Sequence, residues 1–253
     1  MSSEHEHFKG KSAVAHVAEA QARGLIVAAE SHGTEIPGSL AAATDAARET
    51  SIVLLLLSLF SAVLPLNISQ TLLFLSLFLC GWFLWKAGRS AWLGWARLER
   101  LHRILEQERW EIEHNREQER EELTALYAAK GFSGHLLEEV MDVLMADQDR
   151  LLKIMVQEEL GLSLEVYEHP LQQSLGAAVG VILAGMMGIC GYWIYPPYGL
   201  YLAAILVVGA SSILAARAEG NRLIPALVWN LSLVLLAVLV TKFLLDYVLM
   251  QGW

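Results

Sequence analysis

The chain has 253 residues and a formal net charge of −9, and 55% of its residues are hydrophobic. This composition, with a mean hydropathy of +0.43, argues against an ordinary soluble domain. Of the 27 acidic residues, 18 lie within residues 99–168, so no nucleic-acid partner is expected, because phosphate binding requires clustered Lys and Arg.

Residues 1–50 are expected to form a cytoplasmic amphipathic segment. Apolar side chains recur at helical spacing between Ser12 and Glu30, which predicts a helix on the membrane surface or against the acidic segment. Four histidines also occur within the first 32 residues. A metal site is one interpretation of them, but their irregular spacing favours solvated surface side chains.

Apolar stretches predict five membrane-spanning helices, each needing about 20 residues. Residues 51–88 are expected to hold the first two spans, with a turn near Pro65; a re-entrant hairpin is the alternative. Residues 169–253 are expected to hold the other three, because Pro196-Pro197 divides one long apolar stretch and Leu223 begins another. The sequence therefore predicts an all-α, five-span bundle.

The distribution of Lys and Arg predicts the orientation. Basic residues precede the first span, follow the second and connect the fourth to the fifth, whereas the other two turns carry no charge. By the positive-inside rule, the N-terminus and the segment between spans two and three are cytoplasmic. We expect a multi-pass protein of a bacterial inner membrane or an intracellular organelle membrane, with the lipid bilayer as a partner.

The third predicted span has a face of small residues. They recur every four positions, at Gly176, Gly180, Ala184 and Gly188. Small residues at this interval let two helices approach closely in lipid. The partner is either another helix of the same chain or the same helix of a second copy, and the sequence leaves both open.

Residues 89–168 are expected to form a cytoplasmic helical insert between the second and third spans. Its first helix should run from near Gly88 to His114. Asn115, with Gln118 three residues later, resembles a capping box and predicts the start of a new helix. Further helix boundaries are predicted at Gly131, Ser133, Met145, Asp147 and Gly161.

Glutamates on this insert have the spacing of a carboxylate metal site. Glu108 and Glu111 are three positions apart, as are Glu119 and Glu122, so each pair shares a helix face. On one unbroken helix the two pairs would lie about 16 Å apart. A bend at Asn115 would let the pairs face each other, so the predicted helix break and the metal site support one another.

Met155 and Glu159, four positions apart, could close the site from a third side. A thioether beside carboxylates favours a first-row transition ion such as Fe²⁺, with Mn²⁺ and Zn²⁺ as alternatives. The competing interpretation is a solvated acidic face. Residues 99–122 contain nine glutamates with arginines interleaved. A helix this rich in Glu contains glutamate pairs three positions apart by chance.

Two stretches of the insert resemble the vacuolar iron transporter family: residues 119–131 (EREELTALYAAKG) and residues 155–162 (MVQEELGL). The predicted order of elements is also similar, and the likeness covers residues 50–248. The resemblance implies a homodimer that exports ferrous iron from the cytosol in exchange for protons. The metal ligands it implies are Glu108, Glu111, Glu119, Glu122, Met155 and Glu159.

The first two spans depart from the family pattern. An Asp-Gly motif is usual in the first span, but residues 52–66 contain no acidic residue and no glycine, and Asp45 and Glu49 precede them. The second span ends with Lys86 and Arg89, where the family has an Ala-Gly-Glu-type motif. An ion path through lipid requires polar or ionisable groups facing its interior, so these departures bear directly on transport.

Three functions are therefore open, and none is enzymatic, because the sequence has no glycine-rich phosphate loop, HExxH helix or nucleophile elbow. The first is a divalent-metal transporter. The second is a membrane-anchored metal sensor or buffer that lacks transport activity. The third is a structural membrane protein with an acidic interaction domain. We favour transport, because the family resemblance outweighs the two missing motifs.

Overall fold

The computed structural model describes residues 37–158 and 169–251, and every regular element among them is a helix. The chain divides into two compact units. The membrane unit comprises residues 34–96 and 168–253, and the acidic unit comprises residues 1–33 and 97–167. The predicted all-α fold is thus confirmed. The expected amphipathic segment with its histidines lies outside the described residues, apart from the last part of residues 1–50.

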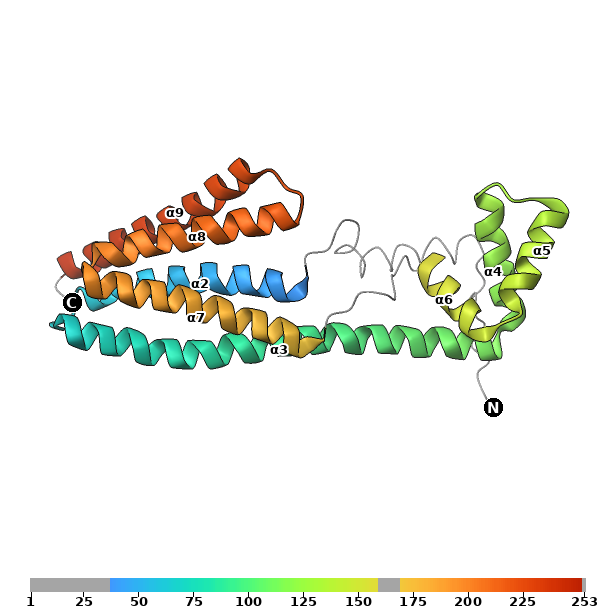
Figure 1. The fold of residues 1–253 in the computed structure, drawn as a ribbon, viewed down its shortest axis with the longest axis horizontal. Helices are drawn as coiled ribbons and strands as arrows, with labels where there is room; N and C mark the ends of the chain where they lie inside the picture. The colour runs from blue at the N-terminus through green and yellow to red at the C-terminus, as the bar shows by residue number, and fades with distance from the viewer. Residues whose placement is uncertain (1–36, 159–168, 252–253) are drawn as a thin grey trace. The chain divides into compact units, whose positions relative to one another are not determined.

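The membrane unit contains five helices, which lie side by side in Figure 1. Within the described residues, four helices are long and apolar enough to cross a membrane: α3, α7, α8 and α9. The fifth, α2, contains residues 51–61 of the predicted first span, and the count of five spans stays a prediction. Helix α2 is not one of the four apolar helices because every 18-residue stretch of it contains three charged residues. The bounds are α2 Gly38–Ser61, α3 Ile68–His114, α7 Pro170–Ile194, α8 Tyr198–Ala218 and α9 Leu223–Met250.

The boundary between the two units falls inside α3. The expected boundary was residues 88 and 89, whereas the structure divides the units between Ala96 and Arg97. Helix α3 has 47 residues and passes through Gly88 without a break. A single glycine costs a helix only about 1 kcal/mol, and no proline is present to end it.

The small face of α7 packs against α2 of the same chain. A Cβ atom added to Gly176 would lie 2.0 Å from the Ser39 carbonyl oxygen, and one added to Gly180 would lie 2.2 Å from that of Ala43. Only glycine permits this approach of two backbones. These contacts decide between the two partners that the sequence left open, and they make α2 and α7 parallel neighbours.

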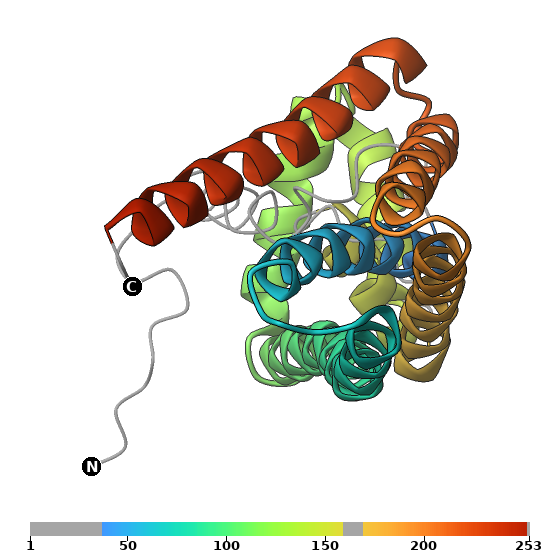
Figure 2. The ribbon, with the colours of Figure 1, turned by 90° about the vertical axis from the view of Figure 1, so that its left-hand side faces the viewer.

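Helix α2 lies in the middle of the membrane unit. Seen end-on in Figure 2, α2 lies between α3 and α9. Its buried Leu54 and Leu55 pack with Leu75 of α3 and Leu200 of α8 in one apolar cluster. By contrast, most of α9 has its apolar side chains exposed, as expected of a helix that faces lipid. The packing of α2 therefore fixes which of its side chains point outward.

The acidic unit is built from the C-terminal part of α3 followed by α4 (Arg116–Ala129), α5 (Gly134–Met145) and α6 (Gln148–Glu158). The predicted break at Asn115 is confirmed, although its side chain makes no capping bond; its carbonyl oxygen instead accepts from the Gln118 N–H at 2.9 Å. Asp147 does cap α6, accepting from the Arg150 N–H at 2.8 Å. Gly131, at φ +100°, follows α4 as predicted, while Gly161 lies outside the described residues.

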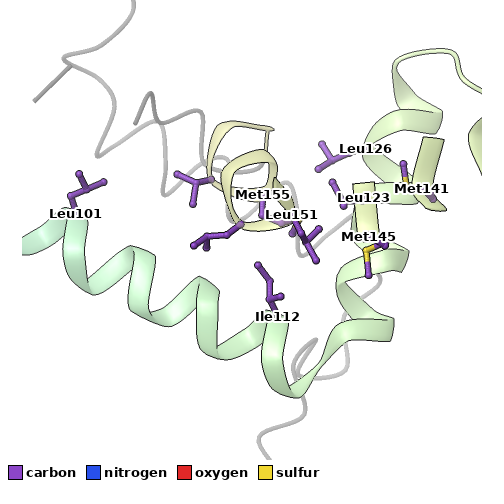
Figure 3. Packing of buried hydrophobic residues seen from close by; sticks show 10 residues of the cluster. Leu101, Ile112, Leu123, Leu126, Met141, Met145, Leu151 and Met155 are labelled. Atoms are coloured by element: carbon purple, nitrogen blue, oxygen red, sulfur yellow. The ribbon is translucent and has the colours of Figure 1, made fainter. Parts of the chain in front are cut away.

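One apolar core holds the acidic unit together. In Figure 3, Ile112 of α3, Leu123 of α4, Met145 of α5 and Leu151 of α6 gather into the same interior. These side chains recur every three or four residues along each helix, so each helix has one buried stripe. Because four helices share this core, a residue on any of the stripes is removed from water.

Candidate metal site

Glu108 lies on the buried stripe of α3. Leu101, Leu105 and Ile112 occupy the same stripe and pack into the core of the acidic unit. The spacing of these four positions is four, three and four residues, which keeps them on one helix face. Glu108 is only 5% exposed, so a carboxylate occupies a position where the helix otherwise carries Leu or Ile.

Helix α4 carries two more buried carboxylates. Glu119 and Glu122 are each 1% exposed. They precede Leu123 and Leu126, which are core residues, and the four positions together make the inner face of the helix. The acidic side chains thus fill the first half of this stripe and leucines fill the second half.

Met155 occupies the corresponding stripe of α6. Its side chain is 0% exposed and belongs to the same core as Leu151 and Ile112, as Figure 3 shows. Its thioether sulfur is thereby excluded from water within the unit that buries the three carboxylates. Glu159, the remaining residue expected on this helix face, lies outside the described residues.

Burial separates two classes of glutamate in the acidic unit. Glu106, Glu117 and Glu121 are exposed, and they fit a solvated acidic face. Glu108, Glu119 and Glu122 do not fit it, because carboxylates are almost never this deeply buried unless they are paired or bind a metal. These three are therefore the structurally distinctive acids of the unit.

Glu111, the remaining expected ligand among the described residues, is half-buried. Its Oε1 accepts a hydrogen bond from Nε2 of Gln107 at 3.0 Å. Among residues 37–158 and 169–251, no three His, Cys, Asp or Glu side chains converge closely enough to hold one ion. The described residues thus bury Glu108, Glu119, Glu122 and Met155 in one core without gathering three acids around a point.

Comparison with known proteins identifies the family. A family model described as the VIT family matches residues 96–245, which is more than half of the 253 residues. The chain belongs to the vacuolar iron transporter (VIT) family. It is accordingly a multi-pass membrane protein of a family of metal-ion transporters. No curated protein and no solved structure matches the chain.

The match to the VIT family covers residues 97–167 of the acidic unit, together with α7, α8 and most of α9. It begins at residue 96, so it starts within α3 and leaves α2 outside. The resemblance read from the sequence began at residue 50, and the matched region is therefore shorter at its start. Both departures from the family pattern lie in the unmatched region.

The structure places the acids of this departing region inside a helix. Asp45 and Glu49 lie within α2, which begins at Gly38, whereas the sequence placed them before the first span. Each has a basic neighbour: Asp45 pairs with Arg48, and Glu49 pairs with Lys86 of α3. The four-residue interval between the two acids is the sequence signal that they share one helix face.

Arginines interleaved with the acids of the VIT insert have a structural role that the sequence analysis did not assign. Arg116 donates to the carbonyl oxygen of Met145, and Arg120 pairs with Asp142 at 2.6 Å. Both arginines lie on α4 and both partners lie on α5. The sequence signal for this role was the four-residue interval between Arg116 and Arg120, because it places both arginines on one helix face.

Proposed function

We propose that the protein transports a divalent metal ion, expected to be Fe²⁺, out of the cytosol, and that the acidic unit collects the ion. The observation that carries this proposal is the burial of Glu108, Glu119 and Glu122 in one helical core together with Met155. Membership of a metal-transporter family supports it. The proposed ligands are Glu108, Glu111, Glu119, Glu122, Met155 and Glu159.

The chemistry of these side chains favours a transition ion. Carboxylate oxygens suit Mg²⁺, Ca²⁺, Mn²⁺ and Fe²⁺, whereas a thioether contributes little to a hard cation. A buried methionine beside carboxylates therefore favours Fe²⁺, with Mn²⁺ and Zn²⁺ as alternatives. Exclusion of water strengthens the attraction, because charges interact more strongly in a medium of low dielectric constant.

The proposed membrane arrangement has five spans, a cytoplasmic N-terminus and a cytoplasmic acidic unit. Helix α2 would be the first span: its 24 residues reach about 36 Å, and it packs parallel to α7. The orientation rests on the distribution of Lys and Arg. A homodimer and exchange of iron for protons complete the proposal, on the basis of the family resemblance.

The test is metal flux into vesicles that contain the purified protein and a dye quenched by Fe²⁺. In the variant Glu119→Gln/Glu122→Gln, we expect flux to be lost, because the two buried carboxylates are neutralised. The matched control is Glu117→Gln/Glu121→Gln, which removes the same charge from exposed positions of the same helix. Equal flux in the two variants would contradict the proposal.

A membrane-anchored metal sensor or buffer is the second candidate. The observation in its favour is that both acids of α2 already have basic partners, Arg48 and Lys86, in a region that the family model does not cover. The same vesicles discriminate the two functions. Metal binding that depends on Glu119 and Glu122, without any flux, would favour the sensor.

A further inference from the structure

Two carboxylates lie on the outward face of α2. Asp45 and Glu49 are one turn apart, and their side chains are 59% and 50% exposed. Their neighbours Ala46, Ala47 and Thr50 are buried against the bundle. In a helix that spans a membrane, ionisable groups are costly and mark functional positions. The groups that neutralise these two acids are therefore relevant to function.

Each acid is matched by one cation. Nζ of Lys86, on α3, lies 2.7 Å from Oε2 of Glu49. Arg48 pairs with Asp45 on the same helix, and its Nη1 also donates to Oδ1 of Asn230 on α9 at 3.4 Å. Two negative charges thus face two positive charges, and the group as a whole is neutral.

Lys86 is the most enclosed member of this group. Its side chain is 11% exposed, less than half the exposure of either acid. One turn earlier on α3, Nε1 of Trp82 donates to Oγ1 of Thr50 at 3.0 Å. The two contacts hold the same stretch of α3 against α2, so the ammonium group is kept beside Glu49 by its own helix.

We propose that Lys86 is a tethered cation, which neutralises the carboxylate face of α2 and thereby keeps mobile divalent cations away from it. An ammonium group is a compact point charge and occupies the position that a free cation would take beside Glu49. Without it, Asp45, Glu49 and Arg48 carry one net negative charge, which attracts a cation from solution. Lys86 is thus a residue that determines specificity in the membrane unit.

This inference is independent of the ion site in the acidic unit. All of its residues belong to the membrane unit, and it concerns a face of α2 that the family model does not cover. A cation could take the place of the Lys86 ammonium group beside Glu49 only after the Lys86–Glu49 pair opens.

The experiment measures thermal unfolding of the full chain in detergent, with and without Mn²⁺. All variants carry Glu119→Gln/Glu122→Gln, so that binding in the acidic unit does not contribute. We expect Lys86→Gln to lower the unfolding temperature by about 3 °C and Mn²⁺ to restore it. Glu49→Gln should also lower it, since an enclosed ammonium loses its partner, but Mn²⁺ should give no recovery.

Two further variants complete the test. Glu49→Gln/Lys86→Gln should unfold close to the background protein and show no response to Mn²⁺, because neither charge is present. Arg89→Gln is the matched control: it removes a positive charge from an exposed position of α3 and should change neither quantity. If Lys86→Gln does not fold, the lowered unfolding temperature expected of Glu49→Gln and its recovery in the double variant still test the pair.

The proposal is overturned by either of two results. One is an unchanged unfolding temperature in Lys86→Gln with no effect of Mn²⁺. The other is a loss of stability in Lys86→Gln that Mn²⁺ does not relieve, since no mobile cation would then take the place of the ammonium group. Loss of iron flux in the Glu119→Gln/Glu122→Gln background leaves both of these outcomes unaffected.

Discussion

Substitution of Gly176 by alanine tests the close contact between α7 and α2. The added Cβ would lie 2.0 Å from the Ser39 carbonyl oxygen, whereas ordinary contact begins at 3.4 Å. The two backbones must therefore separate by more than about 1 Å at this point. Overpacking of this kind costs typically 1–3 kcal/mol, and we expect about 3 kcal/mol here because backbone atoms, and not a flexible side chain, must move.

The assay is thermal unfolding of the purified protein in detergent, followed by tryptophan fluorescence. A loss of about 3 kcal/mol corresponds to a decrease of roughly 6–12 °C for a chain of this size. The matched control is Gly81→Ala, because a Cβ at Gly81 meets nothing within 4 Å. That variant should be unchanged or up to about 1 kcal/mol more stable. Equal unfolding temperatures for the two variants would refute the assigned contact.

Three other outcomes follow from the acidic unit. Met155→Leu conserves core volume, so stability should fall by less than about 1.5 kcal/mol while affinity falls more for Fe²⁺ than for Mg²⁺; an equal loss for both ions would exclude sulfur as a ligand. Calorimetric titration with Mn²⁺ should show weaker binding at pH 5 than at pH 7, because protons compete for the carboxylates; binding independent of pH would argue against carboxylate ligands. Gly131→Ala should cost about 1 kcal/mol in thermal unfolding, because Gly131 has φ +100°; an unchanged unfolding temperature would contradict strain at that position.

Local signals predicted the helix boundaries of the acidic unit well. Asn115, Gly131 and Asp147 all mark helix ends in the structure, because each residue type acts through its own backbone or its near neighbours. The extent of α3 was not predictable in the same way. Helix α3 continues through Gly88 because one glycine costs a helix only about 1 kcal/mol and no proline ends it. The point inside α3 at which one unit gives way to the other depends on packing, which the sequence pattern does not contain.

The depth of individual glutamates was only partly predictable. Spacing alone identified Glu108, Glu119 and Glu122 together with the half-buried Glu111, because every Glu-rich helix contains such pairs. A sharper signal was present in the interval from Leu101 through Leu105 and Glu108 to Ile112. An acid in register with an apolar stripe predicts burial, whereas an acid on the opposite face predicts solvation.

The pairing of Glu49 with Lys86 could not be predicted, since it joins two helices and depends on their register. The sequence analysis treated the lysine as a lost acid and the glutamate as a residue preceding the span. In the structure the two residues neutralise each other. Contacts between distant segments require knowledge of packing, which the four-residue periodicity of a single helix does not contain.

The central claim is that the buried carboxylates and Met155 bind the transported ion. The most direct measurement is a structure of the full protein soaked with Mn²⁺, with the ion located by its anomalous scattering. We predict density in contact with Glu119 or Glu122 and beside the Met155 sulfur, and its loss in Glu119→Gln/Glu122→Gln. Density only at exposed acids such as Glu117 and Glu121, or none in the acidic unit, would contradict the claim.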